Sequence, residues 1–221
     1  MKKFALPLLL AFGFSLAGQA QIVISEIMYN PPESGTDSLE YIELYNNGNT
    51  AVNLENWSLF GVTYTFPALT LDPGQYVVTA VKASAMQSVF GVTALQWTGG
   101  GLNNSGEAVR LLDAGGNTVD EVTYSSMDPW PAAAAGNGPS IVLCDPNAAN
   151  SLPASWQAAT TGTGVIINGK EILGNPGTAS GCQTGVAAFN DTYTGAAGDP
   201  VILPVLSNDF LPGQDPAVVS I

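Results

Sequence analysis

The chain has 221 residues, is 46% hydrophobic and carries a formal net charge of −13, with no histidine. The lack of histidine excludes Ser-His-Asp and Cys-His catalytic arrangements, and the acidic balance disfavours nucleic-acid binding through a basic patch. Frequent glycine and proline between short apolar segments favour an all-β sandwich or barrel.

Residues 1–20 have the pattern of a secretory signal peptide. Lys2 and Lys3 precede an apolar run, 4–16, that is too short to span a bilayer comfortably, and small residues precede a cut after Ala20. An anchoring helix is the alternative. Cleavage would leave three basic residues against eighteen acidic ones, a formal net charge of −15. We therefore expect a secreted or cell-surface protein with no transmembrane segment after cleavage.

Two strands separated by a proline-containing loop begin the mature chain. The first, 22–29, is rich in β-branched and aromatic residues and stops at two consecutive prolines. The second, 39–45, alternates, which places Ile42 on one face and Tyr41 and Glu43 on the other. The later short strands are expected to pack onto this pair.

Short segments bounded by turn residues continue to the middle of the chain. Further strands are expected at 51–54, 57–60, 64–66, 69–71, 75–81, 95–97, 107–112, 118–124 and 140–144. The segment 82–90 is the one expected helix, and Gly91 can end it in the left-handed conformation. Glycine-rich turn residues make 107–112 and 118–124 a hairpin.

The composition divides the mature chain into three parts. Residues 21–145 are expected to form the sandwich, and 146–185 an irregular wrap or linker with a short β-like stretch at 165–167. The composition changes again at 186–221, which reads as the truncated start of a second β-domain. About 35 residues cannot bury a stable core without disulfides, bound metals or oligomerisation.

Cys144 and Cys182 are the two cysteines of the chain. In an exported protein such a pair indicates one disulfide, worth roughly 3–4 kcal/mol for a loop of this length. Two separate thiols are the alternative. Two thiols without histidine make a zinc site improbable.

Several carboxylates on neighbouring predicted strands can meet. Glu26, Glu40 and Glu43 would suit acid/base work or glycoside cleavage if they came together. The simpler interpretation is solvation on a strand face, or hydrogen bonding to Lys82, Arg110 or backbone groups. Asp120 and Glu121 could join Glu26 and Glu43 in an oxygen-rich, calcium-like site. No catalytic residues and no cofactor are assigned from the sequence, and calcium remains the alternative.

The aromatic residues divide into core and surface candidates. Sandwich spacing favours burial for Trp57, Tyr64, Phe66, Tyr76 and Trp97. An exposed interaction patch, for an unknown protein or cell-surface component, is expected at Tyr29, Tyr41, Tyr45 and Trp130. Trp130, between two prolines, also fits a packed plug.

Several motifs in order resemble the lamin tail domain, including EYIELYN (40–46), LDPGQYVV (71–78) and LNNSGEAVRLLDAGGNTVDEV (102–122). The resemblance covers about 22–145 and implies an Ig-like antiparallel β-sandwich without a single shared activity. The opening ISEIMYNPP (24–32) is similar to the bacterial exported branch. Its members serve as accessory domains, sometimes beside nucleases or phosphoesterases.

The C-terminal segment is similar to the start of the cadherin-like or Ig-like repeats of bacterial adhesins, with Asn-Asp pairs at 190–191 and 208–209. Three hypotheses follow. The first is an exported non-enzymatic module for scaffolding or interaction. The second is an accessory domain of a secreted hydrolase of nuclease or phosphoesterase type, and the third is a calcium-stabilised adhesin stalk.

Overall fold

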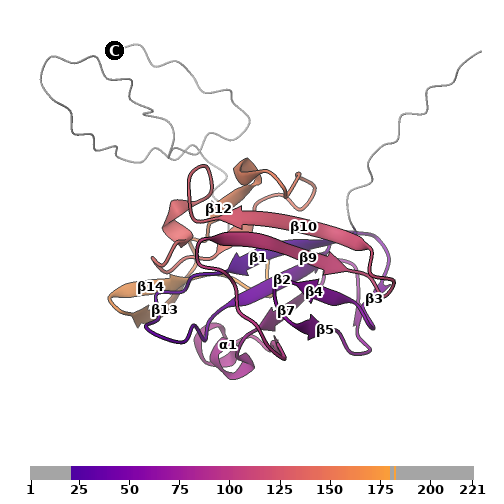
Figure 1. The fold of residues 1–221 in the computed structure, drawn as a ribbon, viewed down its shortest axis with the longest axis horizontal. Helices are drawn as coiled ribbons and strands as arrows, with labels where there is room; N and C mark the ends of the chain where they lie inside the picture. Colours follow the sequence, from indigo (N-terminus) through magenta and orange to yellow (C-terminus); the bar gives the residue numbers. More distant parts are fainter. Residues whose placement is uncertain (1–20, 180–181, 183–221) are drawn as a thin grey trace, which may run out of the picture.

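The computed structural model describes residues 21–179 and Cys182 (Figure 1). The expected signal peptide at 1–20 and the expected second β-domain at 186–221 lie outside the described residues. The strands are β1 (Ile22–Met28), β2 (Tyr41–Asn46), β3 (Val52–Asn53), β4 (Ser58–Phe60), β5 (Tyr64–Thr65), β6 (Thr70–Leu71), β7 (Tyr76–Ala80), β8 (Leu95–Gln96), β9 (Gly106–Leu112), β10 (Thr118–Ser125), β11 (Ile141–Leu143), β12 (Trp156–Ala158), β13 (Gly162–Ile167) and β14 (Lys170–Leu173). The helices are α1 (Ala83–Phe90) and two short 3-10 turns, η1 (Ala132–Ala134) and η2 (Pro153–Ser155). Within the described part of the chain, no helix has the length and apolar character needed to cross a membrane.

Two sheets form an Ig-like β-sandwich, so the predicted all-β fold is confirmed. The larger sheet has the order β12-β11-β1-β2-β7-β8, and the smaller one has the order β10-β9-β4-β5. Neighbouring strands run antiparallel, except for the parallel pair β7 and β8. The predicted hairpin is β9–β10, whose register pairs Val109 with Val122.

The main core lies between the two sheets. It forms because alternate residues of each strand point to one face, and these residues are mostly β-branched or aromatic. The fully buried contributors include Ile22, Ile24, Ile42, Leu44, Val109, Leu111, Val122 and Tyr124. This packing is what the alternating pattern of 39–45 predicts.

A second apolar layer covers the outer face of the six-stranded sheet. Tyr41 and Ala80 point to that face and pack with Met86 of α1 and Ile172 of β14. Gly91 ends α1 in the left-handed conformation, and its N–H bonds to the Gln87 carbonyl. Figure 1 shows α1 and the β13–β14 hairpin together along one side of the sheets. The central strands are therefore buried on both faces.

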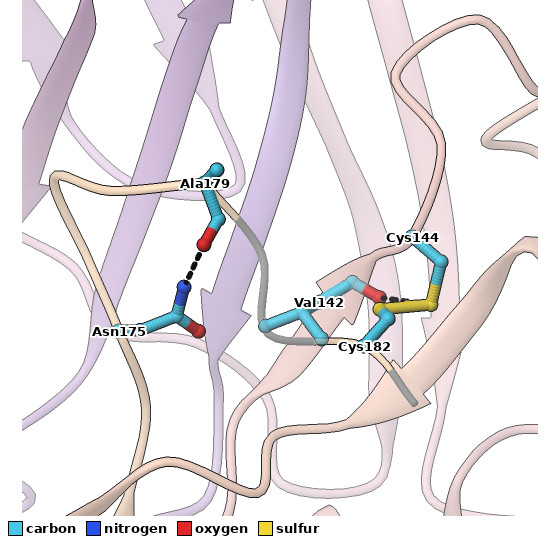
Figure 2. Close-up of a disulfide and its surroundings, with 5 residues drawn as sticks. All are labelled: Val142, Cys144, Asn175, Ala179 and Cys182. Atoms are coloured by element: carbon cyan, nitrogen blue, oxygen red, sulfur yellow. Dashed lines mark hydrogen bonds between the residues drawn. A yellow bond between two sulfur atoms is a disulfide. The ribbon is translucent and has the colours of Figure 1, made fainter. Parts of the chain in front are cut away.

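The segment expected to be irregular, 146–185, contains three strands. β12 extends the six-stranded sheet next to β11, and β13 with β14 forms a separate hairpin. The β-like stretch expected at 165–167 lies in β13. β12 and β14 were missed because they have only three and four residues, and tertiary contacts outweigh such weak propensities. After β14, residues 174–179 cross the outer face of the large sheet and lead to Cys182 (Figure 2). We call residues 174–179 together with Cys182 the clasp.

The clasp is fastened by the disulfide that the sequence predicts. Cys182 is bonded to Cys144, which follows β11, with 5.4 Å between the two Cα atoms. The Asn175 side chain donates to the Ala179 carbonyl at 2.7 Å, which shapes the turn before the disulfide (Figure 2). The disulfide therefore ties the end of the described chain to the large sheet.

Candidate functional site

Glu26 and Glu43 face each other across β1 and β2 on the outer face of the large sheet. The register pairs them directly, and each is 2% exposed. Glu26 reaches this face because a bulge between Ile24 and Glu26 shifts the alternation of β1 by one residue. Like charges directly opposite each other on adjacent strands repel, so this pair needs other support.

The Glu26 carboxylate has three hydrogen-bond donors on a single oxygen. Its Oε1 accepts from the Ser140 hydroxyl at 2.5 Å, from the Asn175 backbone N–H at 3.2 Å and from the Tyr41 hydroxyl. These donors come from the segment before β11, from the clasp and from β2. Glu26 therefore joins three parts of the chain in one buried polar network.

Glu43 has two donors. Its Oε1 accepts from the Ser25 hydroxyl at 2.7 Å, and its Oε2 accepts from the Gly177 backbone N–H of the clasp at 2.5 Å. A cavity of about 20 Å³ adjoins the pair, lined by Ser25, Glu26, Glu43, Tyr45, Tyr76, Leu143 and Pro146. That volume holds about one water molecule, so the pair is closed to any larger substrate.

Burial decides the charge of this pair. Burial raises the pKa of Glu26, and burial followed by the nearby Glu26 charge raises the pKa of Glu43 well above its usual value. In the described residues, the one ion pair joins Arg110 to Glu121, so no cation offsets these two charges. Three donors favour the ionised form at Glu26, so Glu43 is the member of the pair that holds a proton more readily. Neither residue is solvated on a strand face, and each accepts a hydrogen bond from a backbone N–H, which is the other part of the simpler interpretation.

Glu40 lies apart from this pair, although it is also buried, with 4% exposure. Its Oε2 accepts from the Leu102 backbone N–H at 2.8 Å. Burial, with the negative charges of Asp37, Glu107 and Glu33, raises the pKa of Glu40 to about 7. The three predicted glutamates therefore do not form one site.

We expect the protein to be less stable at pH 8 than at pH 5.5. The folded pKa of Glu40, about 7, exceeds its model-compound value of 4.5, so its contribution is full below pH 4.5 and is lost as pH rises through 7. The Glu26–Glu43 pair acts in the same direction. Urea unfolding at the two pH values should differ by about 1–2 kcal/mol from Glu40 alone.

The variant Glu40→Gln should reduce this pH difference, because glutamine does not titrate. Glu55→Gln, at an exposed position, is the matched control and should leave the difference unchanged. Equal stability of the unmodified protein at both pH values would contradict the assignment.

Asp120 and Glu121 do not join Glu26 and Glu43 in a metal site. Asp120 accepts from the backbone N–H of Ile24 at 2.7 Å, which satisfies a donor left without a strand partner beside the bulge. Glu121 instead pairs with an exposed arginine. Across residues 21–179 and Cys182, no group of three or more His, Cys, Asp or Glu side chains is placed to hold a metal ion.

The exposed aromatic patch predicted from the sequence is wrong for three of its four members. Tyr29 is 1% exposed and its ring lies 4.5 Å from that of Tyr124, because the bulge in β1 turns Tyr29 into the main core. The second layer covers Tyr41. Trp130 is buried against Trp156, with ring centroids 6.1 Å apart, which fits the plug interpretation.

Tyr45 is half-buried and stacks on Tyr76 at 4.5 Å beside the cavity. Of the aromatic residues predicted to be core, Tyr64, Phe66 and Trp97 are buried. Four large apolar side chains of the described chain are exposed: Phe60, Met127, Leu152 and Ile166. Their exposure was not predicted from the sequence. They lie on different elements, so they do not repeat the predicted patch.

Sequence reasoning missed the donors that surround the carboxyl pair. Ser140, Asn175 and Gly177 lie more than 110 residues from their glutamate partners along the chain. One signal was present: Glu26 stands inside the otherwise apolar run of β1, and a carboxylate there calls for dedicated partners. The identity of those partners depends on the fold.

Comparison with known proteins defines the family of this chain. No curated protein matches the sequence. The sequence model of the Lamin Tail Domain matches residues 16–126, which is half of the 221 residues. This match agrees with the Ig-like sandwich described above. The chain therefore belongs to the lamin tail domain family.

Proposed function

We propose that the chain is an exported, non-enzymatic β-sandwich module that scaffolds or binds another protein or a cell-surface component. The observation that carries this proposal is the state of its buried carboxyl groups. Glu26 and Glu43 are sealed from substrate-sized molecules, and their oxygens are engaged by donors of the fold itself. Groups held in this way stabilise a structure and leave the outer surface for interaction.

Three features support the export of this module. The pattern of residues 1–20 is that of a cleavable signal peptide. The disulfide between Cys144 and Cys182 persists in oxidising compartments outside the cytosol. The acidic balance of the chain also favours solubility and disfavours contact with nucleic acid. The bacterial exported branch of the family fits these features.

An accessory role beside a secreted hydrolase and a calcium-stabilised stalk are the alternatives. The adhesin-like segment 186–221 that suggested calcium lies outside the described residues. No observation on the described residues favours either alternative over the interaction module. The calcium test below separates the stalk from the interaction module.

The export test uses antibodies raised against the sandwich on fractions of the cells that produce the protein. We expect the protein in the surface or medium fraction, with its first residue at Gln21 by mass spectrometry. Alkylation without reductant should leave both cysteines unmodified, because they are paired. An uncleaved protein in the cytoplasm, or two alkylated cysteines, would overturn the proposed export.

The activity test incubates the purified oxidised chain with bis(p-nitrophenyl) phosphate, magnesium and calcium. We expect no turnover above buffer, because the directly paired carboxyl groups Glu26 and Glu43 are each 2% exposed and adjoin a cavity of about 20 Å³. Turnover that disappears in Glu43→Gln would overturn the non-enzymatic assignment. A rise of the melting midpoint in millimolar calcium over chelator would instead favour the calcium-stabilised stalk, because a ligand selective for the native state stabilises it.

A further inference from the structure

The clasp closes directly over the two buried glutamates. Asn175 donates its backbone N–H to Glu26, and Gly177 donates its backbone N–H to Glu43. The clasp is anchored at one end by β14 and at the other by the disulfide. Its middle therefore depends on hydrogen bonds to a pair of titratable groups.

The clasp is seated too tightly for an added side-chain carbon at its first residue. A Cβ built on Gly174 would lie 2.6 Å from the Tyr41 hydroxyl and 3.0 Å from Glu26 Oε1. Thr178 donates its hydroxyl to the Asn175 carbonyl at 2.9 Å, so the turn is shaped by bonds of its own. This fit means that the closed position is one defined arrangement.

Among residues 21–179 and Cys182, no positive charge holds the clasp closed. The titratable side chains facing the pair are tyrosines: Tyr41 bonds to Glu26, and Tyr45 and Tyr76 line the cavity. Burial raises the pKa of Tyr76 to about 12 and that of Tyr41 well above its usual value, so both side chains stay neutral at physiological pH. The charge of this region is therefore set by the two glutamates alone.

We propose that the clasp is a proton-dependent latch, which stays closed over Glu26 and Glu43 while the pair holds a proton and opens between Asn175 and Gly177 when the pair loses it. The Cys144–Cys182 disulfide keeps the opened segment tethered. The clasp is then held more firmly at acidic than at alkaline pH. This device does not depend on the partner of the module.

The direction of the pH dependence of clasp closure follows from the environment of the two glutamates. Two carboxylates side by side in a buried site repel, and opening the clasp admits water that solvates both of them. The closed form therefore binds a proton that the open form releases. Because the pKa of Glu43 is raised in the closed form, closure is favoured below the pKa of an exposed carboxyl group and weakens as pH rises.

Hydrogen exchange on the full oxidised chain tests the latch. We expect the protection of the Asn175 and Gly177 amides, corrected for intrinsic rates, to fall by about tenfold per pH unit above pH 5 until the pair is fully ionised. The amide of Leu44 in β2, inside the main core, exchanges through global unfolding and should stay more strongly protected than the clasp amides at every pH. Clasp protection that does not change between pH 5 and pH 9 would overturn the proposal.

Matched variants separate the latch from general loosening. Glu43→Gln keeps the shape of the acid without its titration, so clasp protection should lose its pH dependence. Glu121→Gln, an exposed carboxylate paired with Arg110, should keep the dependence of the unmodified protein. Gly174→Ala should open the clasp at all pH values through the steric clash. An unchanged slope in Glu43→Gln would overturn the proposal, and if that variant does not fold, the pH series of the unmodified protein decides.

Discussion

Replacing Glu26 with leucine should lower the free energy of unfolding by about 3 kcal/mol. The substitution removes the acceptor of three donors, the hydroxyls of Ser140 and Tyr41 and the N–H of Asn175, which remain buried. Each unsatisfied buried donor costs about 1–3 kcal/mol, and the relief of one desolvated carboxylate offsets part of the sum. The net result is a large loss in the free energy of unfolding, because one oxygen serves all three donors.

Urea unfolding followed by tryptophan fluorescence measures this loss. Glu26→Gln keeps an acceptor oxygen and should cost only about 1 kcal/mol, so the two substitutions separate hydrogen bonding from charge. Glu55→Leu, at an exposed position, is the control and should be within about 0.5 kcal/mol of the unmodified protein. A loss below about 1 kcal/mol for Glu26→Leu would show that the network contributes little to stability.

Removing the disulfide should have an effect of similar or larger size. With a sequence separation of 38 residues between Cys144 and Cys182, the chain-entropy model gives about 4 kcal/mol for the double substitution to serine. The closed loop contains β12 and the β13–β14 hairpin, which cover both an edge and a face of the large sheet. Loss of the bond therefore affects more than the clasp.

The double serine variant and the reduced native protein should unfold at the same denaturant concentration. Reductant should have no further effect on the variant, which is the control for side reactions. Melting points of the oxidised and reduced proteins that coincide would contradict the predicted contribution. This result would leave the latch testable, since the latch rests on the pH dependence of hydrogen exchange in the oxidised chain.

The local pattern of the sequence determined most of the sandwich. The strand predicted at 39–45 from its alternation is β2, within about two residues. The hairpin predicted from the turn residues between 107–112 and 118–124 is β9–β10. The helix expected at 82–90 is α1, Ala83–Phe90. These features were predictable because period, glycine and proline act over a few neighbouring residues. The cysteine pair was predictable because two cysteines allow only one pairing within the chain.

Only the tertiary structure decided whether the outer face of the large sheet is covered by protein or exposed to water. A single bulge after Ile24 reversed the faces of Glu26 and Tyr29, and no period in the sequence marks an inserted residue. The outer face is covered by elements that follow much later, so Glu43 and Tyr41 are buried rather than solvated. Strand patterns tell which side chains share a face. Whether that face meets water or protein depends on contacts such as Asn175 to Glu26, 149 residues apart, which only the folded chain brings together.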